Sequence, residues 1–228
     1  MAQHSKRYRG AAAKVDRTRT YEPADAFDLL KSLPPAKFDE TVEIVVRLGI
    51  DPKKSDQLVR GAVSLPKGLG KSVRVVVFAE GDKAQAAKAA GADVVGSDDL
   101  ASRIQEGWMD FDVVIASPDM MKHVGKLGKL LGPQGKMPSP KSGTVTAEVA
   151  QAVTDFKAGK VEFRTDAGGN VHAPLGKRSF PTADLLVNLG AFMDHLLGMR
   201  PPAVKGNFVR KICVSTTMGP GALISYGE

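Results

Sequence analysis

The stretch Val73-Arg74-Val75-Val76-Val77-Phe78-Ala79 decides the fold, because it is an almost uninterrupted run of β-branched and aromatic residues. A strand with so few polar residues is typical of a parallel sheet covered by helices on both faces. Two shorter runs of the same kind follow, at residues 93–95 and 112–116. These three runs predict neighbouring strands of one buried sheet.

Helical segments alternate with these strands. The first is rich in alanine, and the third carries Val149, Val153 and Phe156 on one face. We expect each helix to begin at a polar capping residue and to end at a glycine, with the bounds Asp82 to Gly91, Ser97 to Gly107 and Thr146 to Gly159. The alternation predicts a Rossmann-like, three-layer α/β domain over residues 68–159.

The two flanking segments have a different pattern. The expected elements are a helix from 23 to 33, strands at 41–48, 160–164, 171–173 and 209–216, and a helix around 185–196. The glycine-rich turn between the strands at 160–164 and 171–173 predicts a hairpin. Because neither flank alone would bury much core, we expect residues 1–67 and 160–228 to form one discontinuous α+β terminal domain, with the α/β domain inserted into it.

Composition excludes several classes of protein. Of the 228 residues, 43% are apolar and 25% are charged, as in globular proteins rather than disordered ones. No apolar run approaches the roughly 20 residues of a membrane span. Cys213 is the single cysteine, so we expect no internal disulfide and a reducing, cytoplasmic location. The scattered histidines offer no metal-binding spacing, and we expect no metal and no cofactor.

The net charge of +7 lies entirely in the flanks. Residues 1–67 hold 13 basic and 9 acidic side chains, and residues 160–228 hold 8 and 5. Residues 68–159 hold 11 of each. This asymmetry favours a polyanionic partner for the terminal domain.

Motifs for nucleotide chemistry are incomplete. Gly68-Leu69-Gly70-Lys71-Ser72 is similar to a phosphate-binding loop, but the first glycine of that motif would fall at Leu65, and the segment leads into a strand rather than a helix. His195 borders an apolar helix stripe and fits a structural role better than a catalytic one. An α/β enzyme acting on a nucleotide or nucleic acid therefore remains only as an alternative.

A lysine-rich stretch lies between Met120 and Ala147, which contains five lysines and no acid. Two interpretations stay open on spacing alone: a solvated flexible loop, or a surface that contacts phosphates. The second interpretation makes secondary RNA contacts of Lys126, Lys129, Lys136 and Lys141.

The C-terminal segment Ser215-Thr216-Thr217-Met218-Gly219 leaves a predicted strand and turns at once. Hydroxyls, an exposed methionine and backbone amides suit the shallow minor groove and 2′-hydroxyls of structured RNA. Without other polar residues nearby, an ordinary β-turn would be the better interpretation. Lys37, Phe38 and Thr41 at the start of one strand, and Arg164 on the polar face of another, favour the RNA interpretation.

Four stretches carry a resemblance to a known family: Lys37 to Glu43, Val63 to Lys71, Gly132 to Pro138, and Thr216 to Pro220. In order and at family-like spacing, they resemble large-subunit ribosomal protein one of the bacterial type, the family of the mobile ribosomal stalk near the exit site. The resemblance covers nearly the whole chain. It implies the same discontinuous terminal domain, with the principal RNA surface on it.

The resemblance also implies which residues bind RNA and what the protein does. Matching positions are Lys37, Phe38, Thr41, Glu43, Arg164, His172, Ser215, Thr217, Met218 and Gly219. The implied partners are large-subunit ribosomal RNA, the protein's own messenger RNA, whose translation it represses, and exit-site transfer RNA, whose release it assists. We expect a non-catalytic ribosomal protein that is monomeric off the ribosome. A nonspecific RNA chaperone is a further alternative.

Overall fold

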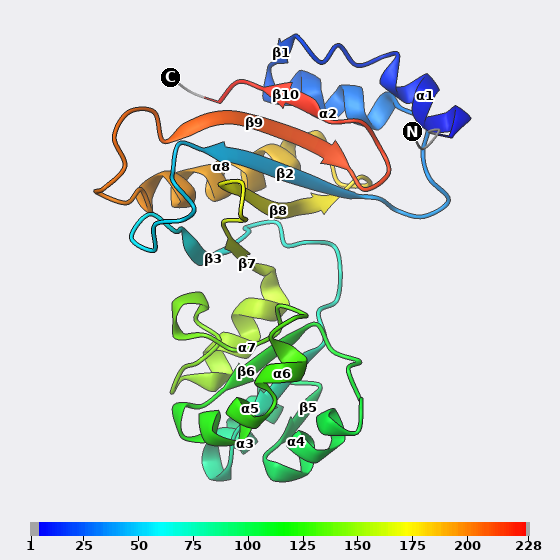
Figure 1. Ribbon diagram of the computed structural model, residues 1–228. Coiled ribbons are helices and arrows are strands. Elements are labelled where there is room, and N and C mark those ends of the chain that lie inside the picture. The colour runs from blue at the N-terminus through cyan, green and yellow to red at the C-terminus, as the bar shows by residue number, and fades with distance from the viewer. Residues whose placement is uncertain (1–4, 227–228) are drawn as a thin grey trace. The chain divides into compact units, whose positions relative to one another are not determined.

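The computed structural model describes residues 5–226, which divide into two compact units (Figure 1). Unit 1 combines the segment that ends at Gly70 with the segment that begins at Val161, and unit 2 is Lys71–Lys160. The charge and residue pattern of the chain predicts the corresponding boundaries at 67/68 and 159/160. Each unit has its own hydrophobic core.

The described part of unit 1 contains a five-stranded sheet of order β1-β10-β9-β2-β8. Its strands are β1 (Thr20–Tyr21), β2 (Thr41–Leu48), β8 (Asn170–Lys177), β9 (Val209–Thr216) and β10 (Ala222–Ile224). β1 is parallel to β10, and the other neighbours are antiparallel. The predicted bounds of the strands at 41–48 and 209–216 are confirmed, because their alternating apolar pattern leaves one face to be buried.

Helices α2 (Pro23–Ser32) and α8 (Thr182–Gly198) pack on one face of this sheet (Figure 1). Their apolar stripes, including Phe27, Leu30 and Phe192, are buried against the inward side chains of the strands. His195 sets its ring edge-on to Phe163 with 6.0 Å between centroids, a packing arrangement that agrees with a structural role. A short helix, α1 (Lys6–Ala12), precedes this core.

The predicted hairpin is wrong. β7 (Lys160–Arg164) pairs with β3 (Arg60–Ser64) in a separate two-stranded sheet, and a single bridge between Thr165 and Val171 joins its end to β8. β8 is the edge strand of the five-stranded sheet and pairs only with β2 there, so β7 and β8 do not form a ladder. An ion pair between Arg60 and Glu162, 2.8 Å long, accompanies the β3–β7 pairing.

Unit 2 contains a parallel three-stranded sheet, as predicted, and the strand order is β5-β4-β6. Its strands are β4 (Val75–Phe78), β5 (Val94–Gly96) and β6 (Val113–Ala116). Helices α3 (Gly81–Ala89) and α7 (Val149–Ala158) cover one face, and α4 (Asp98–Gln105), α5 (Met121–Lys126) and α6 (Gly128–Leu131) cover the other. The mixed α/β content and the parallel sheet are therefore confirmed.

Two predicted helix caps are wrong. Asp82 lies inside the first turn of α3, which begins at Gly81 after Glu80. Thr146 lies before α7 and accepts a hydrogen bond from the amide of Glu148, the residue that precedes the helix. Ser97 does precede α4, but its side chain does not cap the helix. Instead, its backbone amide donates to the Asp99 carboxylate in the first turn.

The lysine-rich stretch is partly helical. It contains α5, α6 and a single 3₁₀ turn at Pro140–Ser142, and another 3₁₀ turn, Pro118–Met120, leads into it. Leu127 and Leu131 are fully buried and anchor the stretch to the core of unit 2. Glycines at both sides of these leucines obscured the helical period in the sequence.

Candidate nucleic-acid interface

The sheet of unit 1 has an open face opposite α2 and α8. The side chains of β2 alternate between the core and this open face, where Thr41, Glu43, Val45 and Arg47 lie. Strand register places Glu43 beside Ser215 of β9, and Val45 beside His172 of β8. Register thus brings Thr41, Glu43, His172 and Ser215 to one face, although they come from three strands distant in the sequence.

The Met218 turn, residues Thr216–Gly219, lies at the start of β2. The Thr217 amide donates to the Thr41 carbonyl (3.0 Å), and the Thr41 amide donates to the Thr217 hydroxyl (2.9 Å). A Cβ at Gly219 would lie 2.3 Å from the Thr216 hydroxyl oxygen, so a larger residue there would force the Thr216 side chain or the turn to shift. The turn holds Met218 with half of its surface exposed.

The Phe38 loop, residues Pro34–Asp39, lies at the same end of β2. Lys37 and Phe38 are exposed, and Phe38 is 54% exposed despite its apolar ring. An exposed aromatic ring and an exposed methionine beside polar strand ends are able to contact bases and riboses. The loop and the turn thus supply the apolar part of the candidate interface.

Glu40 connects the Phe38 loop with the Met218 turn. Its carboxylate is almost fully buried and accepts from the Ala36 amide (2.7 Å) and from the Met218 amide (3.1 Å). Burial raises the pKa of Glu40, but the hydrogen bonds from Thr216 and from these amides outweigh burial and hold the pKa below its ordinary value. The carboxylate is therefore charged at neutral pH and fixes both segments.

Arg178 compensates the buried charge of Glu40. Its guanidinium lies 3.3 Å from Glu40 and also donates to the carbonyls of Lys31 (2.7 Å) and Leu33. Neither Glu40 nor Arg178 is among the residues predicted from the sequence. An acid just before an apolar strand is a weak signal, but its buried partner stands 138 residues away, so the pairing is not visible in the sequence.

Arg164 and His172 have different surroundings from the rest. Arg164 is exposed on β7, outside the five-stranded sheet, so strand pairing does not bring it to the open face. His172 lies 3.3 Å from Asp166, a contact that orients its ring. Hydrogen bonds from Asn170, and then from His172 and a backbone amide, hold the pKa of Asp166 far below its ordinary value.

The lysines of unit 2 also separate into two kinds. Lys126, Lys129 and Lys141 are exposed. The ammonium of Lys136 instead donates to the Phe111 carbonyl at 2.7 Å and lies 4.7 Å from the centre of the Phe111 ring. Lys136 therefore stabilises the packing of unit 2, and its ammonium already has protein partners.

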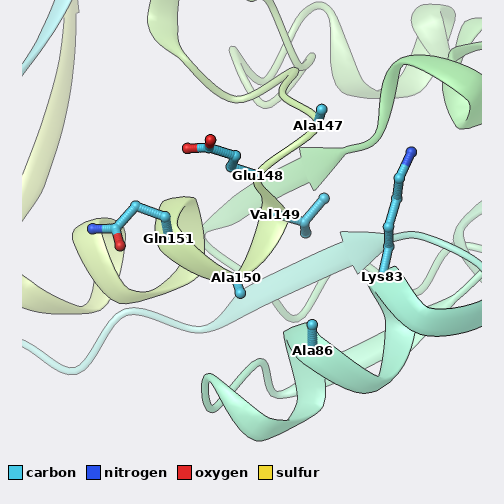
Figure 2. Close-up of a pocket in the computed structure, with 7 residues that line it drawn as sticks. All are labelled: Lys83, Ala86, Ala147, Glu148, Val149, Ala150 and Gln151. Atoms are coloured by element: carbon cyan, nitrogen blue, oxygen red, sulfur yellow. The ribbon is translucent and has the colours of Figure 1, made fainter.

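Unit 2 has two hollows, and the one at the usual nucleotide position is lined by carboxylates. A hollow of about 420 Å³ lies between α3 and the start of α7 (Figure 2), lined by Lys83, Ala86, Ala147, Glu148, Val149, Ala150 and Gln151. A smaller one, about 270 Å³, lies at the carboxyl ends of β4 and β6, where nucleotide-binding sheets hold phosphates. It is lined by Glu80, Asp82 and Asp119, and its Lys83 is 2.9 Å from Asp119. Three carboxylates would repel a phosphate, which opposes the enzyme alternative.

Residues 5–226 show neither a metal-binding cluster nor a membrane-spanning helix. No group of three or more His, Cys, Asp or Glu side chains there is arranged to hold a metal ion. No helix in that range is long and apolar enough to span a bilayer.

Comparison with known proteins gives one consistent family. The model of the ribosomal protein L1p/L10e family matches residues 29–220. The chain is similar to proteins named large ribosomal subunit protein uL1 from three bacteria. Identity is 55% to that of Mycobacteroides abscessus (all of this chain, 97% of the relative) and 56% to that of Thermobifida fusca (95% and 92%). It is 54% to that of Kosmotoga olearia (99% and 98%).

Proposed function

This chain belongs to the ribosomal protein L1p/L10e family, and from that premise we propose that it is a large-subunit ribosomal protein of the cytoplasm that binds large-subunit ribosomal RNA through unit 1. One observation carries the assignment of the surface. The open face, the Phe38 loop and the Met218 turn meet at one end of β2, and a buried carboxylate joins the two loops.

The chemistry of this surface suits the minor groove of folded RNA. Ser215 and Glu43 present a hydroxyl and a carboxylate that are able to bond 2′-hydroxyls. Phe38 and Met218 offer apolar contact to riboses or bases. Unit 1 carries 20 basic and 14 acidic residues, against 12 and 11 in unit 2, so its charge attracts phosphates.

The proposal includes the finer expectations from the family. Unit 1 is the RNA-binding domain and unit 2 a domain inserted into it. The protein also binds its own messenger RNA and represses its translation, and it assists the release of deacylated transfer RNA from the exit site. Off the ribosome it is a monomer. The exposed Lys126, Lys129 and Lys141 are the secondary RNA contacts that we propose on unit 2.

Competition binding tests the proposed target. The full-length protein is titrated with a ribosomal RNA fragment that carries a helical junction, with bulk transfer RNA as competitor. We expect the junction to bind at least tenfold more tightly, about 1.4 kcal/mol. Equal affinity would support the nonspecific chaperone instead. A large thermal stabilisation by ATP, NAD or S-adenosylmethionine would favour the enzyme alternative.

Substitutions in the Met218 turn test the surface. We expect Thr217→Val and Met218→Ala each to cost about 1–3 kcal/mol of RNA affinity, because Thr217→Val leaves the Thr41 amide unpaired and Met218→Ala removes a central contact. Thr217→Ser keeps the hydroxyl and should restore most of the affinity. Leu197→Ala, which truncates an equally exposed apolar residue on α8, is the control and should bind normally.

A further inference from the structure

Arg7, near the start of α1, reaches across to the candidate interface. One terminal nitrogen of its guanidinium donates to the Met218 carbonyl (2.7 Å), and the other donates to the Pro34 carbonyl (3.1 Å). The second nitrogen also lies 3.8 Å from Glu40. One side chain thus contacts both the Met218 turn and the Phe38 loop, from a helix that belongs to neither.

This arrangement needs the shape of arginine. The two carbonyls belong to segments 184 residues apart in the sequence, and a planar guanidinium presents donors to both at once. A lysine has the same charge, but its single nitrogen on a flexible side chain cannot present two separate, rigidly placed donors to the two carbonyls. Glu40 already joins the two segments through their amides, so Arg7 adds a second link through their carbonyls.

The surroundings allow Arg7 to be changed without loss of the fold. Helix α1 has its own attachments: Ser5 caps it by accepting from the Tyr8 amide, and Ala11 is buried in the core of unit 1. Glu40 would keep its ion pair with Arg178. The buried charge therefore stays compensated when the Arg7 side chain is removed.

We propose that Arg7 is a positioning residue for RNA recognition, which holds the Met218 turn and the Phe38 loop at a fixed separation before RNA binds. The inference rests on the proposed function of unit 1. Its physical basis is preorganisation: a surface that is already ordered loses less conformational entropy when it binds. Both nitrogens that would otherwise reach a phosphate are turned to protein carbonyls, so Arg7 acts through the two loops.

The test compares Arg7→Gln and Arg7→Lys with a matched control, Arg9→Gln. Arg9 is exposed on the same helix, and its substitution removes the same charge. Affinity for the junction-bearing ribosomal RNA fragment is measured over a range of salt concentrations, and stability is measured by urea unfolding. We expect both Arg7 variants to bind about tenfold more weakly, the effect of one lost charge-assisted hydrogen bond. Arg9→Gln should bind within about twofold of the original.

The salt dependence separates positioning from phosphate contact. The logarithm of the binding constant falls linearly with the logarithm of the salt concentration. Each lost phosphate contact makes this fall less steep, by about 0.9 in the slope. We expect the slope to stay unchanged for both Arg7 variants. Full affinity of Arg7→Lys together with a reduced slope in Arg7→Gln would overturn the proposal, because charge alone would then explain the effect.

A double-mutant cycle separates positioning from a general loss of structure. If Arg7 acts through the Met218 turn, Arg7→Gln should cost less affinity in a Met218→Ala background than in the original protein. Additive costs, or a urea midpoint that falls in parallel with affinity, would refute the positioning role. If the original protein does not prefer the junction over transfer RNA, the proposed function is wrong. If the original protein has this preference and the Arg7 variants keep it in full, only the role of Arg7 is wrong.

Discussion

Glu40 is a charged residue in a place where charge is costly, and the structure compensates it with two arginines and two backbone amides. Removing Glu40 itself would leave the largely buried Arg178 without its counterion, which costs more than never having formed the ion pair. The carboxylate therefore affects both the stability of unit 1 and the shape of the candidate interface.

Glu40→Gln should lower the free energy of unfolding of unit 1 by about 3 kcal/mol at pH 7, because the Arg178 charge loses its buried counterion. Urea unfolding followed by far-ultraviolet circular dichroism measures the change. Glu43→Gln removes an exposed carboxylate of β2, three residues further along the chain, and should change the free energy of unfolding by less than about 0.5 kcal/mol. Equal effects of the two substitutions would contradict the role assigned to Glu40.

The pH dependence of stability follows from the lowered pKa of Glu40. The folded state holds this pKa below that of the unfolded chain, so the contribution is present above the ordinary carboxyl value and is lost as the pH falls through the folded-state value. The original protein should lose stability across that acidic range more steeply than Glu40→Gln. If the free energy of unfolding varies with pH in the same way in both proteins, Glu40 does not contribute to the pH dependence of stability.

Gly219→Ala tests the close packing of the Met218 turn. A Cβ there would lie 2.3 Å from the Thr216 hydroxyl oxygen, so the Thr216 side chain or the turn must shift. We expect about a tenfold loss of affinity for the ribosomal RNA junction, about 1.4 kcal/mol. Gly198→Ala is the matched control, because a Cβ at the end of α8 would meet nothing within 4 Å. Unchanged binding by Gly219→Ala would mean that the turn does not touch RNA.

At the scale of elements, the sequence predicts what is local and misses what is distant. The alternation of apolar residues in β2 and β9 and the stripe of α8 are visible in the chain itself, so these elements were predicted well. The hairpin prediction failed because the partner of β7 is β3, about 100 residues earlier. A turn signal between two strands indicates only that the chain reverses there.

The candidate interface divides in the same way. Phe38, Thr217 and Met218 were predicted because residues next to a strand end stay close to it in space. Glu40 and Arg178 were missed because their importance lies in burial, and a charged side chain gives no sequence signal of being buried. Lys136 was grouped with the exposed lysines for the same reason, since its partner is the Phe111 carbonyl 25 residues earlier.

Lys136→Gln should destabilise unit 2 by about 1–2 kcal/mol, because the ammonium loses its carbonyl and its aromatic neighbour. Trp108 is the single tryptophan and lies 5.3 Å from Phe111 between ring centroids, so its fluorescence reports the unfolding of unit 2. Lys129→Gln, at an exposed position of α6, should leave the transition unchanged. A similar shift in both variants would contradict the distinction between the two lysines.

At the scale of the whole molecule, the two units differ in what they offer to RNA. Unit 1 joins both ends of the chain and carries most of the positive charge together with the open face and its two loops. Unit 2 is nearly neutral and has its own pair of hydrophobic layers around a parallel sheet. Because each unit has its own core, we expect each to fold independently of the other.

Replacing residues 71–160 by a short glycine–serine linker should therefore leave the RNA affinity within about threefold of the original. A tenfold loss would require contacts worth about 1.4 kcal/mol of binding free energy to lie in unit 2. Residues 71–160 expressed alone should fold, as judged by Trp108 fluorescence, and should bind the junction at least 100-fold more weakly. Binding is measured at the same salt concentration for all three proteins, because phosphate contacts depend on it. Strong binding by the isolated central segment, with none by the linked terminal segments, would transfer the RNA-binding role to unit 2 and overturn the assignment of the open face.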